Sequence, residues 1–246
     1  MGDIMYRIAI ITDIHGNIYA LNSVLKDIKK KSVDYIYCLG DMIGIGPFSN
    51  EVLNSLFELN NIEMITGNHD EAVLSLLNNE PYPESRINVI LHHKWIANKL
   101  NKEYIPKLKK LPRILNPTIC EQNLHLIHYP MKQSLYGVHI SKDPFDFTGV
   151  PSPEHFYELD GLDNISLICF GHDHNSHQFV SKGKLFYNTG SLGCFNEAFA
   201  RYGIIDINKR GINIMQQYVP YEFHTYVDEI RKTNIPRKEI IIALYE

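Results

Sequence analysis

Five short polar segments, each placed directly after an apolar run, hold most of the side chains in this sequence that could do chemistry. Between them they supply carboxylates, imidazoles and one amide oxygen, which suit borderline divalent cations such as Mn²⁺, Fe²⁺ and Zn²⁺. A single Asp or His in such a place is usually a turn former or a solvated side chain. Only the whole set indicates a metal site, and its candidate ligands are Asp13, His15, Asp41, Asn68, His128, His172 and His174.

The size of this set predicts two metal ions rather than one. Seven ligands, four of them imidazoles, are more than a single ion usually takes. Asp41 comes from the middle of the first three segments and is the best candidate for a carboxylate that bridges two ions. Two ions roughly 3.5–4 Å apart can clamp an in-line displacement at phosphorus, and they turn a water molecule into hydroxide near neutral pH. The hypothesis is therefore hydrolysis at phosphorus without a Ser or Cys nucleophile.

The apolar runs are expected to be strands that place these side chains together. Strands that alternate with amphipathic helices indicate βαβ units and a parallel sheet. Ligands bind such sheets at the carboxyl ends of the strands. Asp41 lies 28 residues after Asp13, and Asn68 lies 27 residues after Asp41, about one βαβ unit in each case. We expect strands at 6–12, 34–40 and 62–66 and helices at 17–31 and 50–60.

The rest of the chain is expected to complete one domain, residues 1–246, with a helical insertion at about 80–111. Further strands should end at His128 and His172, and antiparallel strands should follow at 184–191 and 200–220. His92 and His93 fall on the insertion, and we assign them no role.

Composition narrows the classes of function. The net charge of −4 gives no electrostatic reason to expect strong binding to nucleic acid or to an anionic membrane. No apolar run approaches the roughly 18 residues of a membrane-spanning helix. The cysteines form no CxxC pair, which is typical of a reducing, cytoplasmic protein without disulfides. They are Cys38, Cys120, Cys169 and Cys194.

The polar segments together resemble, in order and spacing, the motifs of the calcineurin-like metallophosphoesterases. The stretches DIHGN at 13–17 and GDMIGIGPFSNEVL at 40–53 are similar to a bacterial and archaeal branch. That branch contains small phosphodiesterases and dinucleoside tetraphosphate hydrolases. The resemblance implies an α/β fold of four layers, an α/β/β/α sandwich of two mixed sheets flanked by helices.

The resemblance also implies roles for individual residues. Asp13, His15 and His174 would hold the first ion, Asn68, His128 and His172 would hold the second, and Asp41 would bridge them. The ions would be divalent or trivalent: Mn, Fe, Zn, Co or Ni. His69 would protonate the leaving oxygen without binding metal, Asp70 would orient His69, and Gly67 would let the backbone turn after the strand. The partner would be a small phosphorylated substrate, with a nucleotide favoured, and inorganic phosphate would bind as a product-like ligand.

Two departures from the family pattern leave the substrate open. Tyr129 follows His128 where the family usually has glycine, and Gly193-Cys194-Phe195-Asn196 lacks the arginine that the branch often has. The nearest arginine is Arg201, to which no role is assigned. A phosphodiester or a dinucleoside polyphosphate is the favoured substrate. Phosphomonoesterase or serine/threonine protein phosphatase activity, or a catalytically silent interaction scaffold, are the alternatives.

Overall fold

Two β-sheets and a set of surrounding helices make up the fold in a computed structural model, which describes residues 5–145, 149–157 and 159–246. The strands are β1 (Tyr6–Ile11), β2 (Tyr35–Cys38), β3 (Ile62–Met64), β4 (Ile114–Leu115), β5 (Thr118–Ile119), β6 (Gln122–Ile127), β7 (Leu167–Phe170), β8 (Ser176–Ser181), β9 (Lys184–Thr189), β10 (Phe199–Asn208) and β11 (Gly211–Pro220). The α-helices are α1 (Ile18–Lys30), α2 (Ser49–Phe57), α3 (Asn68–Asn78), α4 (Ile90–Lys99), α5 (Tyr104–Leu108), α6 (Phe223–Lys232) and α7 (Lys238–Ile242). Short 3₁₀ helices are η1 (Glu84–Val89), η2 (Gln133–Leu135) and η3 (Ile140–Lys142).

The first sheet carries the predicted βαβ repeat. Its order is β11-β10-β1-β2-β3, with β1, β2 and β3 parallel and with β10 antiparallel to β1. Alternate residues of β1 enter two different cores, Ile8 and Ile10 on one face and Ala9 and Ile11 on the other. Burial on both faces explains why this strand is continuously apolar instead of alternating.

The second sheet packs face to face against the first. Its order is β4-β6-β7-β9-β8, with β5 paired to β6, and its central strands β6, β7 and β9 are parallel. Leu124, Leu126, Leu167 and Cys169 meet the inner face of the first sheet in a shared core. The expectation of two mixed sheets flanked by helices is therefore confirmed.

The two outer layers differ in regularity. Helix α1 covers the first sheet with its buried face of Ala20, Leu21, Val24 and Ile28, and Asn17 caps its first turn by accepting from the Ala20 N–H at 3.0 Å. The outer face of the second sheet is covered mainly by loops and short 3₁₀ helices of the described segments 129–145, 149–157 and 159–162. Its aromatic and aliphatic side chains form a separate core against β6 and β7.

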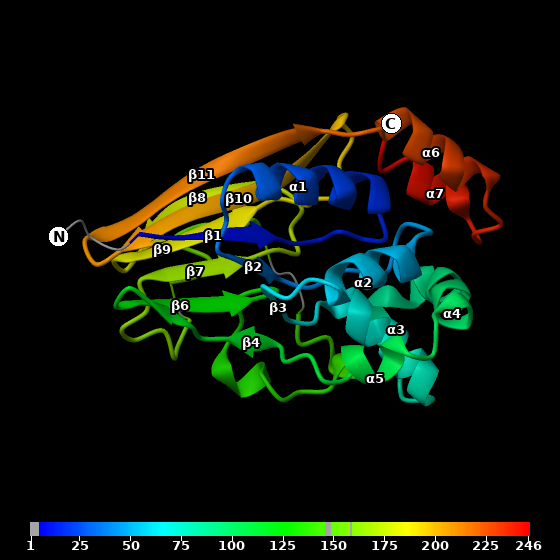
Figure 1. Cartoon of the computed structure of the whole chain (residues 1–246). Helices are drawn as coiled ribbons and strands as arrows, with labels where there is room; N and C mark the ends of the chain where they lie inside the picture. The colour runs from blue at the N-terminus through cyan, green and yellow to red at the C-terminus, as the bar shows by residue number, and fades with distance from the viewer. Residues whose placement is uncertain (1–4, 146–148, 158) are drawn as a thin grey trace.

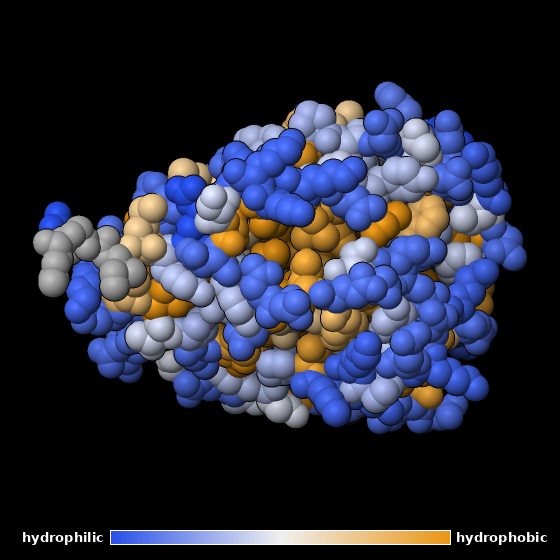
Figure 2. All heavy atoms as spheres, in the orientation of Figure 1, coloured by the Kyte–Doolittle hydropathy of each residue, from blue (hydrophilic) through white to orange (hydrophobic). Residues whose placement is uncertain are grey.

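The parallel strands of both sheets point to the same end of the molecule. Figure 1 shows the arrowheads of β1, β6 and β7 directed toward the end where α2 to α7 gather. The polar segments that follow these strands therefore lie at the end of the molecule that the helices cover. Figure 2, in the same orientation, shows an apolar surface patch beside α1 that is surrounded by polar residues. A groove next to α1 is lined by the apolar residues Leu25, Ile28, Val33, Ile36 and Leu59. No helix in the described part of the chain is long and apolar enough to cross a membrane.

Candidate metal centre and catalytic site

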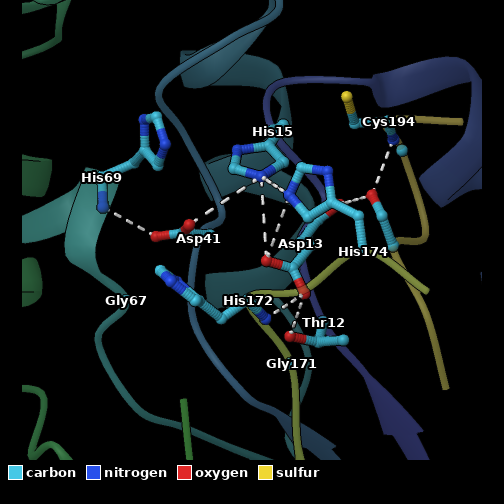
Figure 3. Close-up of polar contacts among 12 residues, drawn as sticks. Thr12, Asp13, His15, Asp41, Gly67, His69, Gly171, His172, His174 and Cys194 are labelled. Carbon is cyan, nitrogen blue, oxygen red and sulfur yellow. Dashed lines mark hydrogen bonds and ion pairs between the residues drawn. The ribbon is translucent and has the colours of Figure 1, made fainter. Parts of the chain in front are cut away.

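The first group of predicted ligands is Asp13, His15 and His174, and the two imidazoles lie next to Oδ1 of Asp13 (Figure 3). Oδ2 of Asp13 accepts hydrogen bonds from the Thr12 hydroxyl at 2.9 Å and the His172 N–H at 3.0 Å. Oδ1 is buried and has no hydrogen-bond donor among the described residues. It lies 3.7 Å from Nε2 of His15 and 3.6 Å from Nε2 of His174. A buried carboxylate oxygen without a donor, beside two imidazole nitrogens, fits a cation.

Asp41 reaches both groups of ligands. Its Oδ1 accepts from the backbone N–H of His69 at 2.8 Å, which fixes the carboxylate. Its Oδ2 lies 3.3 Å from Nε2 of His128 and 3.8 Å from Nε2 of His15. One oxygen that faces an imidazole of each group has the position that a bridging carboxylate needs.

The second group gathers at the amide of Asn68. Oδ1 lies 3.0 Å from Nε2 of His128 and 2.8 Å from Nδ1 of His172. The amide also fits when it is turned over, because its nitrogen then donates to both imidazoles and its oxygen accepts from Arg86 at 2.8 Å and 3.2 Å. A cation would select the first orientation, since only the amide oxygen can ligate it.

Backbone carbonyls set the direction of two of the imidazoles. Nδ1 of His128 donates to the Leu39 carbonyl at 2.7 Å, and Nδ1 of His15 lies 3.3 Å from the Ile43 carbonyl. A carbonyl oxygen only accepts, so Nδ1 carries a proton and Nε2 is the nitrogen that faces the centre. This is the ring orientation that a metal ligand requires.

The charges of the centre depend on burial and on Asp41. Burial lowers the pKa of His15 to about 3, so this ring is neutral. Burial also acts to lower the pKa of His128, but the charge and hydrogen bond of Asp41 outweigh it and raise that pKa to about 9. In the same pair, burial acts to raise the pKa of Asp41, yet His128 holds it well below its ordinary value. A cation at this centre would therefore displace a proton from His128.

The backbone is strained at most of the predicted ligands. Five of the seven have a left-handed conformation with positive φ, which is uncommon for residues other than glycine. Such outliers cost about 1–3 kcal/mol each and persist where the surrounding structure imposes them, often at functional sites. The five residues, with φ from 50° to 70°, are Asp13, His15, Asp41, His172 and His174.

Gly67 does not act as the sequence suggested. It has φ of −106° and ψ of 178°, an extended conformation open to any residue, and it caps helix α3, which begins at Asn68. The glycine is required by a close approach instead. A Cβ atom at this position would lie 2.1 Å from Oδ1 of Asp41 and 2.4 Å from its backbone nitrogen. The chain does pass from β3 to α3 at Gly67, but the backbone angles there do not call for glycine.

Asp70 also has a different partner from the predicted one. Its Oδ1 accepts from the Ile43 N–H at 3.1 Å and its Oδ2 from the Gly67 N–H at 3.0 Å. As the third residue of α3, Asp70 reaches back to the N–H of the cap residue Gly67, which is the acidic half of a capping box. Both oxygens are occupied by backbone donors, and the prediction that Asp70 orients His69 is wrong.

The side chain of His69 contacts His93, a residue that had no predicted role. Its Nδ1 lies 2.9 Å from Nε2 of His93, on helix α4 of the predicted insertion. Nδ1 of His93 lies 2.8 Å from the hydroxyl of Tyr82. On its other side the His69 ring makes an edge contact with His15, with centroids 5.1 Å apart. A histidine on a helix that is far away in sequence gave no local signal of this contact.

Arg86 is the second residue that the sequence analysis passed over. It lines a cavity of about 100 Å³ beside the second ligand group, together with Asn68, His172, Asp143 and Phe145. Within the described residues its guanidinium forms no ion pair with a carboxylate, although it contacts the Asn68 amide. An arginine at the edge of a metal centre fits phosphate oxygens.

Arg201 and Tyr129 have structural positions. Arg201 donates to the carbonyls of Ser191 at 3.3 Å and His174 at 2.6 Å, and it stacks on the Phe195 ring. It is buried and holds the backbone that presents His174, away from the cavity. Tyr129 is buried in the outer core of the second sheet, with its ring 5.0 Å from that of His172.

Comparison with known proteins now decides the family. The profile of the family described as calcineurin-like phosphoesterase matches residues 6–176, which include all seven candidate ligands. The chain belongs to this family. The calcineurin-like phosphoesterases are metal-dependent, and this member is accordingly a metal-dependent phosphoester hydrolase.

Several proteins are similar to this member of the family over almost its whole length. An uncharacterised protein of Methanocaldococcus jannaschii is 28% identical over 93% of each chain. A hypothetical protein of Pyrococcus horikoshii has the same fold with a TM-score of 0.77 at 16% identity over 98% of each chain. A metallophosphoesterase of Sphaerobacter thermophilus has a TM-score of 0.73 at 20% identity, over 99% of this chain and 100% of its own. A protein named as a candidate diadenosine tetraphosphatase has a TM-score of 0.58 at 19% identity, over 87% of this chain and 94% of its own.

Proposed function

We propose that this phosphoesterase works with two cations. Asp13, His15 and His174 would hold the first, Asn68, His128 and His172 would hold the second, and Asp41 would bridge them. The observation that carries the proposal is the position of Oδ2 of Asp41, 3.3 Å from His128 and 3.8 Å from His15. The mixed oxygen and nitrogen donors suit Mn, Fe, Zn, Co or Ni. When bound, the cations would activate water and neutralise charge on the phosphoryl group.

The protein's own groups would do the remaining work. His69 would give the proton of Nε2 to the leaving oxygen as the bond from phosphorus to that oxygen breaks. Its backbone N–H is tied to Asp41, so its ring stays next to the centre without replacing a ligand. Arg86 would bind phosphate oxygens from the side of Asn68. It would take the place of the arginine that the branch often has where this sequence reads Gly193-Cys194-Phe195-Asn196.

A phosphodiester or a dinucleoside polyphosphate is the favoured substrate. The likeness of 13–17 and 40–53 to a branch with these substrates supports this choice. The shared fold of a candidate diadenosine tetraphosphatase is compatible with it. The cavity beside Arg86 is lined by apolar Ile140 and Phe145 as well as polar groups, so it could receive part of a nucleotide next to the phosphate. Inorganic phosphate should inhibit as a product.

Metal stoichiometry and hydrolysis together test this function. Protein freed of metal by chelation should bind two Mn²⁺ per chain. It should then hydrolyse bis-p-nitrophenyl phosphate or diadenosine tetraphosphate faster than p-nitrophenyl phosphate. Asp41→Asn should lose the second equivalent of metal and the activity, whereas the exposed Asp163→Asn should keep both. Binding of a single ion, or metal-loaded protein without activity on any phosphoester or anhydride, would contradict the proposal.

A further inference from the structure

The insertion supplies the only described hydrogen-bond partner of the His69 side chain. Nδ1 of His69 lies 2.9 Å from Nε2 of His93, and the two rings meet edge to face with centroids 5.0 Å apart. His93 is fully buried, so solvent does not compete for this contact. Its other nitrogen lies 2.8 Å from the Tyr82 hydroxyl, which in turn donates to the Arg86 carbonyl at 3.2 Å.

Neither of the nearest alternatives can take the place of His93. Asp70 is held by two backbone N–H groups, those of Ile43 and Gly67. The loop after β2 passes the ring at Gly44, where an added Cβ would lie 2.5 Å from Cβ of His69 and 2.8 Å from its Nδ1. The φ of Gly44 is also +116°, so any side chain there would be strained. No side chain at position 44 can therefore hold the ring.

The Arg86 carbonyl determines which atoms donate and which accept in the series of hydrogen bonds from His69 through His93 and Tyr82. A carbonyl oxygen only accepts, so the Tyr82 hydroxyl donates to Arg86 and its oxygen is left to accept from Nδ1–H of His93. Nε2 of His93 then has a lone pair and accepts from Nδ1–H of His69. Burial lowers the pKa of His93 to about 3, in keeping with a neutral ring that can accept. The nitrogen of His69 that exchanges a proton with substrate is thereby Nε2.

We propose that His93, supported by Tyr82, is the positioning residue for His69. It holds His69 in the Nδ1–H form, with Nε2 directed to the leaving oxygen. For the reaction, Nε2 takes up a proton from solvent, so that His69 is the imidazolium. The oxygen of water then bonds to phosphorus while that water gives up a proton to solvent, the bond to the leaving oxygen breaks, and the leaving oxygen takes the proton from Nε2. His69 is left neutral with Nδ1–H still donated to His93. The inference rests on the proposed role of His69 as proton donor.

Leaving-group dependence separates positioning from mere structural support. A leaving phenol needs the proton of His69 much more than p-nitrophenol does, because p-nitrophenolate is stable without it. His93→Leu should therefore lower kcat about 10–100-fold for a phenyl ester and less than about threefold for the matching p-nitrophenyl ester, at unchanged metal content. His93→Gln offers an oxygen acceptor to Nδ1–H and should restore most of the phenyl ester activity. Equal losses on both esters, or no rescue by Gln, would overturn the proposal.

The neighbouring histidine provides a matched control. His92 is on the same helix and is buried, but neither of its ring nitrogens has a hydrogen-bond partner among the described residues. His92→Leu should leave the ratio of the two rates unchanged. His69→Ala distinguishes the two levels of the argument. If His69→Ala does not change the ratio, the proposed role of His69 fails and this inference with it. If His69→Ala changes it and His93→Leu does not, only the inference fails.

A second measurement uses NMR on the wild-type protein and requires neither an activity assay nor a substitution. Long-range ¹H–¹⁵N spectra of the histidine rings report which ring nitrogen carries the proton. In wild-type protein freed of metal by chelation, neutral His69 should be protonated at Nδ1 and bare at Nε2. A spectrum that shows His69 protonated at Nε2 alone would refute the proposed direction of the hydrogen bonds.

Discussion

Replacement of Gly67 by alanine tests how tightly the metal centre is packed. The new methyl group would lie 2.1 Å from Oδ1 of Asp41 and 2.4 Å from its backbone nitrogen, whereas ordinary contact begins at 3.4 Å. The segments after β2 and β3 must therefore separate by about 1 Å. A side-chain rotation cannot relieve the clash, because one of the two partners is backbone.

The same displacement should damage stability and function together. Overpacking costs about 1–3 kcal/mol, and the loss of glycine at the helix cap adds up to about 1 kcal/mol. Metal sites tolerate ligand shifts of only about 0.2 Å, and Oδ2 of Asp41 sits between the two ligand groups. We expect weaker metal binding and a loss of about 100-fold in kcat/KM, the effect typical of a misplacement of 1 Å.

Three measurements on Gly67→Ala should agree. These are thermal unfolding with and without Mn²⁺, metal content after dialysis against fixed Mn²⁺, and hydrolysis of bis-p-nitrophenyl phosphate. Gly137→Ala is the matched control, since an added Cβ there would have no atom within 4 Å and its φ is not left-handed. Wild-type metal affinity and unfolding temperature in Gly67→Ala would refute the reasoning.

Three further predictions follow from single contacts. Asp70→Asn should lower the free energy of unfolding by about 1–3 kcal/mol, because an amide nitrogen would face a backbone N–H; the ratio of rates on phenyl and p-nitrophenyl esters should stay constant, and a changed ratio would restore Asp70 as the partner of His69. Arg86→Gln should raise KM about 10–100-fold at constant metal content, with partial recovery in Arg86→Lys; an unchanged KM would remove Arg86 from substrate binding. Burial lowers the pKa of His125 to about 4, below the unfolded value near 6.5, so the unfolded state binds the extra proton and stability falls as pH drops from about 6.5 to 4. The contribution of His125 to this fall is at most about 3 kcal/mol. Urea unfolding at pH 7 and pH 4.5 should show that the free energy of unfolding falls less in His125→Gln than in the wild type. An equal fall in both proteins would contradict this prediction.

Local patterns were sufficient to predict the strands and the grouping of the candidate ligands at one end of the sheets. The apolar runs before Asp13, Asp41 and Asn68 predicted parallel strands because only strands buried on both faces are apolar without alternation. The spacing of one βαβ unit then predicted that the three segments share an edge. The structure brings these residues together with His128 and His172 from the second sheet. The C-terminal helices α6 and α7 were not anticipated.

What holds the chemical groups in place was decided by tertiary structure. The sequence shows that positions 67 and 70 are Gly and Asp, but it does not show which contacts require these residues. Gly67 is needed because the segment after β2 passes against it, and Asp70 is taken by the N–H of Ile43, 27 residues away. His93 and Arg86 reach the centre because helix α4 and the 3₁₀ helix η1 lie against it. Ligand types follow from chemistry that a sequence displays directly, whereas hydrogen-bond partners depend on distances between segments that the sequence does not contain.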